Sequence, residues 1–216
     1  MKRFKAMNNQ FEDIAEQLEN HFDKRVEMYG AGLQSVDWKS TEAQYNRFRQ
    51  LLKVVDRSKP FSINDYGCGC GELINLLKAS NFDFDYFGFD VSSQMIEKAE
   101  EIYRAFDNCS FSTESRDLPV ADYTIASGIF NLKFGADDER WKEYMLKTVH
   151  ELNAVSRLGF SFNALTSYSD IEYQRADLYY ADPLFWFDYC KRNISKRVSL
   201  LHDYPEYDFT IIVRKD

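Results

Sequence analysis

The strongest constraint on the fold is an alternation of strand-like and helix-like segments that begins after Pro60 and continues to the end of the 216-residue chain. Short apolar runs rich in aromatic and β-branched residues indicate strands, and apolar residues at helical spacing indicate the helices between them. The expected order is strand, helix, strand, helix, strand, strand, helix, strand, helix, strand, strand. The expected strands cover residues 61–65, 85–90, 109–113, 123–130, 158–165, 197–204 and 207–215.

This order predicts an α/β fold with a doubly wound, seven-stranded, mostly parallel sheet, because a helix that joins two parallel strands must cross a face of the sheet. A tight turn at Pro205 joins the last two strands, so we expect an antiparallel hairpin at the C-terminus. Residues 9–28 and a second segment capped by Ser40 or Thr41 read as helices. We therefore expect one domain over residues 1–216, with an N-terminal helical cap (1–58) and an α/β core (59–216).

The charge balance limits the partners. Lys and Arg number 27 against 35 Asp and Glu, and the formal net charge of −8 argues against nucleic acid or an anionic membrane as a partner. No apolar run follows the first ten residues, so we expect no secretory signal, no membrane span and a cytoplasmic location. The four cysteines form no disulfide framework, and Cys68 and Cys70 lack a partner pair for zinc, so we expect no metal site.

A glycine-rich loop, Asp-Tyr-Gly-Cys-Gly-Cys-Gly, occupies residues 65–71 between the first strand and a helix. Sheets of this type bind ligands at that edge, and glycines let the backbone approach a ligand with positive φ. Asp90 ends the next strand, where its carboxylate can accept hydrogen bonds from both hydroxyls of a ribose; alternatively, Asp90 caps the following helix. A dinucleotide-dependent oxidoreductase is disfavoured, because Glu72 stands where its third glycine would lie and would repel a pyrophosphate.

Three segments resemble the class I S-adenosylmethionine-dependent methyltransferases. DYGCGCGEL is similar to their first motif, FGFDVSSQMIEKAEE to their second, and DLPVADYTIASGIF to their Leu-Pro loop and fourth strand. The resemblance spans about residues 61–165 and implies the Rossmann-like methyltransferase fold with S-adenosylmethionine as cofactor.

The resemblance also implies roles for individual residues. The loop glycines would wrap the methionine and ribose, Asp90 would hold the ribose, and Met95 would pack on the adenine. Either Glu114 or Asp117 would receive the adenine amino group. Arg47, on the second helix, would bind the cofactor's carboxylate, unless it is simply an exposed arginine. The expected cofactor-binding residues are Asp65, Gly67, Cys68, Gly69, Gly71, Asp90, Val91, Met95, Glu114, Asp117, Ser127 and Arg47.

The acceptor is expected beyond the fourth strand, whose end faces the methyl group in this fold. In-line methyl transfer depends mainly on alignment and on removal of a proton where the acceptor starts protonated. We expect Asn131 and Tyr180 to be the catalytic residues on this side. Phe130, Tyr179 and Trp38 are expected to complete the walls of the acceptor pocket.

Two motifs of methyltransferases that act on nucleic acids or proteins are absent from the sequence, and this bears on the class of acceptor. No Asn- or Asp-Pro-Pro-Tyr segment follows the fourth strand, and there is no Pro-Cys pair of the kind used for cytosine carbon methylation. Together with the acidic charge, these absences favour a small-molecule acceptor. Two alternatives stay open: a non-catalytic S-adenosylmethionine-binding scaffold or subunit, and a protein or RNA methyltransferase. The sequence also leaves open the acceptor, the methylated atom and the oligomeric state.

Overall fold

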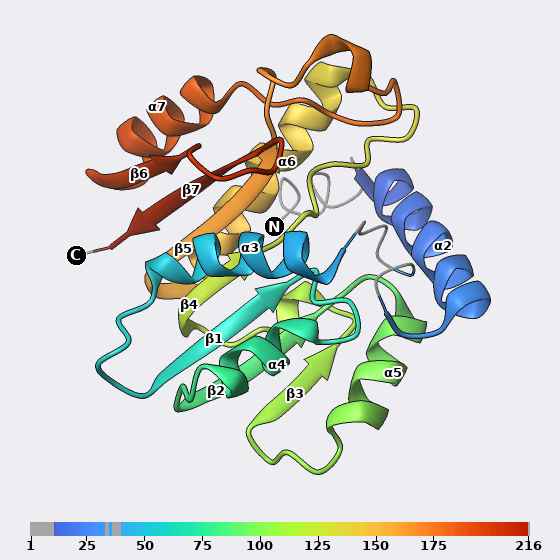
Figure 1. Ribbon diagram of the computed structural model, residues 1–216, viewed down its shortest axis with the longest axis vertical. Helices are drawn as coiled ribbons and strands as arrows, with labels where there is room; N and C mark the ends of the chain where they lie inside the picture. The colour runs from blue at the N-terminus through green and yellow to red at the C-terminus, as the bar shows by residue number, and fades with distance from the viewer. Residues whose placement is uncertain (1–10, 33–34, 36–39, 216) are drawn as a thin grey trace, which may run out of the picture.

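The computed structural model describes residues 11–32, 35 and 40–215, in which a seven-stranded sheet forms the centre of the molecule (Figure 1). The strand order is β3-β2-β1-β4-β5-β7-β6. β7 is antiparallel to both of its neighbours, whereas the pairs from β3 to β5 are parallel. The predicted mostly parallel sheet with a C-terminal antiparallel hairpin is therefore confirmed. The strands are β1 (Phe61–Tyr66), β2 (Phe84–Phe89), β3 (Cys109–Ser112), β4 (Ala121–Ala126), β5 (Ser156–Leu165), β6 (Arg197–Leu201) and β7 (Asp208–Arg214).

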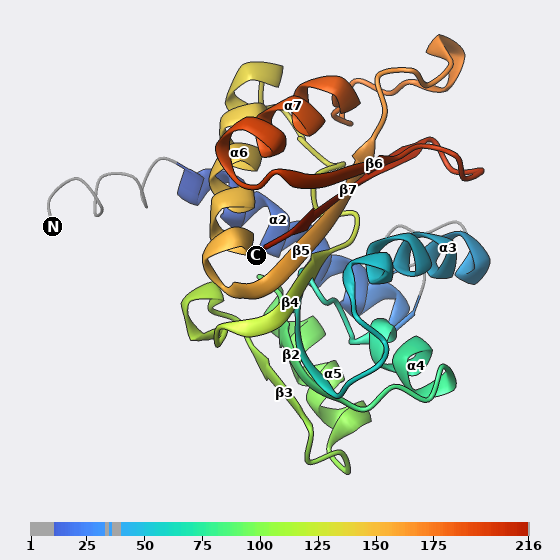
Figure 2. The same cartoon turned by 90° about the vertical axis from the view of Figure 1, so that its left-hand side faces the viewer.

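Helices cover both faces of the sheet, as a doubly wound fold requires (Figure 2). One face packs against α3 (Thr41–Leu51), α4 (Glu72–Ala79) and α5 (Ser93–Tyr103), and the other against α6 (Asp138–Ala154) and α7 (Pro183–Asn193). Each face has its own apolar core. Ile63 and Leu73 lie in the first core, and Trp141, Phe162 and Trp186 lie in the second, all with no more than traces of exposed surface.

The N-terminal helix α2 (Glu12–Tyr29) lies beyond the C-terminal ends of the central strands, between α5 and α6 (Figure 1). Polar contacts join it to both helices. Ser92 at the start of α5 donates to Asp23 at 2.5 Å, and Arg140 of α6 donates to Asp13 at 2.6 Å. The apolar face of α2 therefore turns toward the strand ends, where Ile14 and Leu18 are buried.

Two strands end earlier than the sequence predicts. β4 ends at Ala126, not at residue 130, because the backbone leaves the sheet at Gly128, which has a φ of 75°. Phe130 therefore lies in a turn, where it is fully buried and its carbonyl accepts a hydrogen bond from Trp141 Nε1 at 2.9 Å. β6 ends at Leu201, and the chain then turns through Pro205 before β7.

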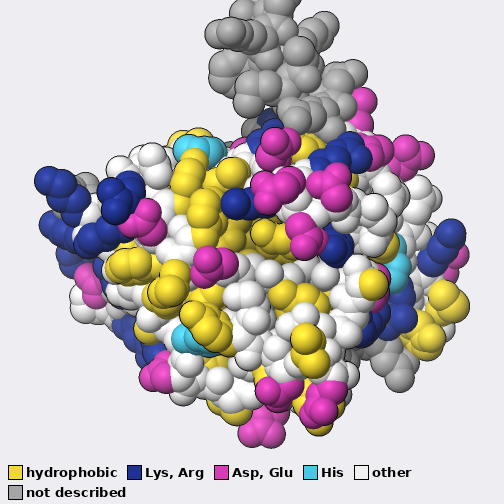
Figure 3. Space-filling view, turned by 90° about the horizontal axis from the view of Figure 1, so that it is seen from above, with side chains coloured by type: hydrophobic (Ala, Val, Ile, Leu, Met, Phe, Trp, Pro, Cys, Tyr) yellow, Lys and Arg dark blue, Asp and Glu magenta, His cyan; other side chains and the backbone are white. Residues whose placement is uncertain are grey.

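The surface is mixed in character. Acidic, basic and hydrophobic side chains are interspersed on the face seen from above (Figure 3). The connection between β5 and α7 contains a short 3-10 helix (Ile171–Tyr173) and exposes Tyr168, Ile171 and Tyr173. Among the helices in the described part of the chain, none is both long and apolar enough to cross a membrane.

Candidate active site

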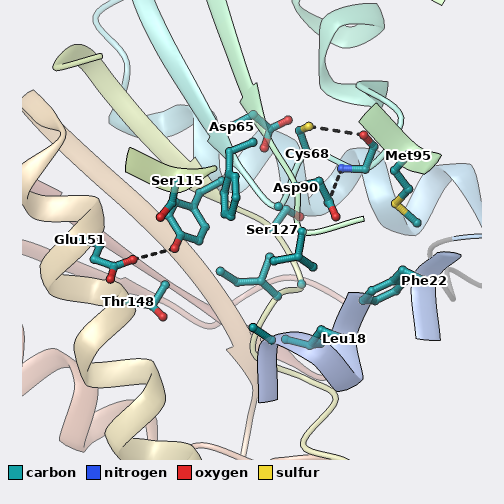
Figure 4. Close-up of a pocket in the computed structure, with 18 of the residues that line it drawn as sticks. Leu18, Phe22, Asp65, Cys68, Asp90, Met95, Ser115, Ser127, Thr148 and Glu151 are labelled. Carbon is teal, nitrogen blue, oxygen red and sulfur yellow. Dashed lines mark hydrogen bonds between the residues drawn. The ribbon is translucent and has the colours of Figure 1, made fainter. Parts of the chain in front are cut away.

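A cavity of about 410 Å³ lies where the C-terminal ends of β1, β2 and β4 meet α2, α3 and α6. Pockets for small ligands in proteins commonly have volumes of 300–1,000 Å³. The order of the strands reverses between β1 and β4, so the cavity lies at the switch point where α/β sheets bind ligands. Figure 4 shows Cys68, Asp90 and Met95 on one side of it, Ser115, Thr148 and Glu151 on the opposite side, and Ser127 between them.

The glycine loop after β1 has a backbone that only glycines accommodate easily. Gly67, Gly69 and Gly71 have φ values of 82°, 54° and 84°, which is the left-handed region. A Cβ atom at Gly67 would lie 2.2 Å from Ile129 Cγ2. The loop is tied to β2, because the backbone N–H groups of Gly67 and Cys68 both donate to the Phe89 carbonyl, at 2.7 and 2.9 Å.

Asp90 is buried directly after β2 and is held by the backbone. Its Oδ2 accepts from Gly69 N at 2.8 Å and its Oδ1 accepts from Ser92 N at 3.0 Å. Burial raises the pKa of this carboxyl, and the two backbone donors oppose that shift. The cap of α5 is Ser92, whose hydroxyl accepts from Met95 N at 3.2 Å. Asp90 is therefore not needed as the cap, and its remaining lone pairs are available to a ligand.

Asp65 lies on the opposite face of β1 from its neighbour Tyr66, as strand alternation requires. It is 2% exposed, and its Oδ2 accepts from the hydroxyl of Tyr86 on β2 at 2.8 Å. Burial raises the pKa of Asp65 to about 7, the Tyr86 hydrogen bond lowers it, and the nearby Asp90 raises it. Asp65 is also among the residues that line the cavity.

Most of the residues predicted to bind the cofactor line this cavity. Gly71 does not; it directly precedes α4 and packs close to Tyr103, whose Cε2 would lie 2.7 Å from a Cβ at this position. Asp117 does not either; it is exposed and accepts from Ser112 Oγ at 2.9 Å. Those that line the cavity are Asp65, Gly67, Cys68, Gly69, Asp90, Val91, Met95, Glu114 and Ser127.

The structure places Arg47 outside the cavity lining. Its Nε forms an ion pair with the buried Asp208 on β7, and its Nη1 donates to the Ala43 carbonyl at 3.1 Å. Gln44, one turn earlier on α3, lines the cavity instead. α3 therefore lines the cavity through Gln44 and Phe48 and not through Arg47, the residue expected from the sequence.

The residues predicted for the acceptor side also lie elsewhere. Asn131 Oδ1 accepts from Leu165 N at 3.3 Å and its carbonyl accepts from Tyr179 N at 2.8 Å, so Asn131 joins the loops after β4 and β5. The hydroxyl of Tyr180 accepts from Arg175 N at 3.0 Å, on the surface. Phe130 is a core residue and not a pocket wall, and Tyr179 is buried outside the lining. Trp38 lies outside the described residues.

α6 contributes a wall of the cavity that was not predicted from the sequence. Tyr144, Lys147, Thr148 and Glu151 line the cavity at spacings of three and four residues, next to the buried stripe of the same helix. Tyr66 reaches this wall, where its hydroxyl donates to Glu151 Oε2 at 2.7 Å. Such spacing is a detectable signal, because residues i, i+3, i+4 and i+7 share one face of a helix. Other unpredicted lining residues include Phe11, Leu18 and Phe22 of α2 and Phe48 of α3.

Comparisons with known proteins agree with this geometry. A family model described as a methyltransferase domain matches residues 58–137. A Mycobacterium tuberculosis protein whose name assigns it to the methyltransferases is 50% identical over 164 residues, which cover 76% of this chain and 99% of that protein. The magnesium protoporphyrin IX methyltransferase of Synechocystis PCC 6803, solved with S-adenosylmethionine, has a TM-score of 0.63 at 16% identity, covering 96% of this chain and 97% of that one. The N-methyltransferase NodS of Bradyrhizobium japonicum, solved with S-adenosylhomocysteine, has a TM-score of 0.62 at 12% identity, covering 90% and 98%.

The sheet order, the glycine loop and the buried Asp90 define the class I methyltransferase fold, which the two solved structures share. The chain belongs to the methyltransferase family, because the mycobacterial relative is 50% identical over almost its whole length. It is therefore an S-adenosylmethionine-dependent methyltransferase, and the residues of the cavity fit that cofactor. They include the glycine loop, the buried Asp90 carboxylate, whose oxygens each keep a lone pair, and the buried hydroxyl of Ser127, which has no hydrogen-bond partner.

Proposed function

We propose that this methyltransferase acts on a small-molecule acceptor, with the cofactor and the acceptor enclosed in one cavity. The observation that carries the proposal is that the same 410 Å³ cavity contains the glycine-loop residues and a second, polar wall on α6. Phe11, Leu18 and Phe22 of α2 line it as well, so the N-terminal helix screens the reacting groups from water. A site of this size and enclosure suits a small molecule.

The cofactor side of the cavity is assigned from the lining. Asp90 accepts the ribose hydroxyls, and Val91 and Met95 pack on the adenine. Of the two acids considered for the adenine amino group, Glu114 lines the cavity and Asp117 does not, so we assign this contact to Glu114.

Asp65 completes the cofactor side. Tyr86 occupies its Oδ2, and the other oxygen is available to the cofactor's ammonium group. A buried carboxylate favours such a positive partner, because an unpaired buried charge is costly.

When bound, the cofactor supplies a methyl group on a positively charged sulfur, which is already activated for displacement. The chain therefore needs chiefly to align the acceptor and exclude water. The end of β4 carries out this alignment. Its position is fixed by Gly128 N, which donates to Asn163 Oδ1 at 2.9 Å, and its Ser127 hydroxyl, buried without a hydrogen-bond partner, is free to bind a ligand.

The test of the acceptor class is release of S-adenosylhomocysteine from S-adenosylmethionine in the presence of a fractionated cell extract. Ultrafiltration separates the low-mass compounds from the proteins and nucleic acids. We expect release with the low-mass fraction and none above background with the macromolecular fraction. The Asp90→Ala variant is the control, and it should release less S-adenosylhomocysteine when the S-adenosylmethionine concentration is limiting. Release with the macromolecular fraction alone would show that the acceptor is a protein or RNA.

A further inference from the structure

The α6 wall, made of Tyr144, Lys147, Thr148 and Glu151 together with Tyr66 and Ser115, is a separate recognition surface within the cavity. Figure 4 places Glu151, Thr148 and Ser115 across the cavity from Asp90 and Met95, with Ser127 between the two groups. In this fold the methyl group faces the end of β4, which is where Ser127 lies. An acceptor must therefore lie beyond Ser127 from the glycine loop, and the α6 wall is on that side.

The wall carries one charge of each sign. Glu151 Oε1 lies 3.7 Å from Lys147 Nζ, which is longer than a hydrogen bond, so both groups keep hydrogen-bonding capacity. Among the described residues that line the cavity, Lys147 is the only one with a basic side chain. A cation bound here is attracted by Glu151 and repelled by Lys147, and the reverse holds for an anion, so neither gains a net partner for the hydration that it loses. A neutral hydroxyl can donate to the Glu151 carboxylate and accept from the Lys147 ammonium without that cost.

The two tyrosines of the wall, Tyr66 and Tyr144, are neutral, and each combines a polar hydroxyl group with an apolar ring. Burial raises the pKa of Tyr144 to about 12 and raises that of Tyr66 as well, with Glu151 adding to both shifts, so both side chains remain phenols. The ring of Tyr144 meets Phe11 edge-on at 5.8 Å between centroids, and that of Tyr66 meets Phe89 at 4.7 Å. These rings offer apolar surface to a ligand beside the hydroxyl donors and acceptors.

We propose that the α6 wall binds a neutral, hydroxyl-bearing part of the methyl acceptor, with Glu151 accepting from its hydroxyl groups and Lys147 donating to them. This inference rests on the proposed function, since it assigns the chemical class of the acceptor in the same cavity. An alcohol with an adjoining apolar or aromatic portion meets the requirements of the wall. A carboxylate, a phosphate or an ammonium in that position does not.

The experiment uses three probes of one shape and different charge: tyrosol (an alcohol), tyramine (an ammonium) and 4-hydroxyphenylacetate (a carboxylate). Their dissociation constants for the protein saturated with S-adenosylhomocysteine are measured by titration with NMR detection. In the parent protein, tyrosol should bind most tightly. Glu151→Gln leaves Lys147 unbalanced and should favour the carboxylate, and Lys147→Met leaves Glu151 unbalanced and should favour the ammonium. Each change relative to tyrosol should be about fivefold, since these charges are partly exposed.

Glu143→Gln is the matched control, because Glu143 is exposed on the same helix and does not line the cavity. It should leave the order of the three probes unchanged. Binding of S-adenosylhomocysteine is measured first and tests the proposed function separately, since its absence would refute that function. The inference alone fails if the cofactor product binds but tyrosol does not, if an ion binds the parent as tightly as tyrosol, or if the two charge variants do not shift the order in opposite directions. A loss of S-adenosylhomocysteine affinity in Glu151→Gln would assign the wall to the cofactor.

Discussion

At the scale of single residues, we expect Asp65 to set how binding of the cofactor responds to pH. Burial raises its pKa to about 7, so ionising this carboxyl costs the ligand-free fold stability as the pH rises from about 4 to about 7. The affinity for the cofactor should change in the opposite direction and increase as the pH rises, because only the ionised Asp65 attracts the cofactor's ammonium group. The Tyr86 hydroxyl, which donates to Asp65, favours the ionised form and thereby supports binding at neutral pH.

We expect the affinity for S-adenosylmethionine to fall as the pH is lowered below about 7, by up to about tenfold per pH unit. Tyr86→Phe removes a hydrogen bond to the ionised carboxylate, so it should move the midpoint of this dependence to higher pH. Calorimetric titrations at a series of pH values measure both effects. Asp65→Asn is the control: it should bind the cofactor more weakly than the parent, and its affinity should not show this dependence on pH. A Tyr86→Phe midpoint equal to that of the parent would contradict the positioning role of Tyr86.

At the scale of elements, local sequence patterns predict the helices and strands, whereas contacts between elements that are distant in the sequence depend on how these elements pack. The order of the strands along the chain, the Ser40 cap and the positive φ angles of the glycine loop follow from residues close together in the sequence, and the structure confirms them. The partner of Arg47 is 161 residues away, on β7, and no local pattern indicates it. The spacing along α6 shows which of its residues share a face, but that this face and α2 line the cavity depends on how the helices lie across the sheet edge.

The Arg47–Asp208 pair links α3 to β7, and its burial makes its loss costly. Asp208 is fully buried; burial raises the pKa of its carboxyl, and Arg47 lowers it. Arg47→Met leaves that carboxyl unpaired and should lower the free energy of unfolding by about 3 kcal/mol. Denaturant titration measures this, and the double variant Arg47→Met/Asp208→Leu should recover much of the loss. If Arg47→Met instead kept its stability and lost cofactor affinity, Arg47 would bind the cofactor's carboxylate, as the sequence-based expectation has it.

At the scale of the whole molecule, three distant parts of the chain build one cavity: α2 at the N-terminus, the glycine loop with Asp90, and α6. The loop carries the family pattern, and its residues 65 and 67–69 line the cavity as the sequence predicts, whereas Gly71 does not. The acceptor side was not, because Phe130 turns into the core and Asn131 is engaged between two loops. The wall that we propose for the acceptor comes from α6, so variants of α6 and variants of the glycine loop test the two proposed sides separately.

The central claim is that the glycine loop and Asp90 bind S-adenosylmethionine, and isothermal titration with S-adenosylmethionine and S-adenosylhomocysteine tests it most directly. We predict one site per chain, and a loss of about 1.5–3 kcal/mol of binding free energy in Asp90→Ala, because hydrogen bonds to a charged group are lost. Asp117→Asn, a change at an exposed acid outside the lining, should bind like the parent. No heat and no thermal shift with either ligand, or an Asp90→Ala variant with unchanged affinity, would contradict the account.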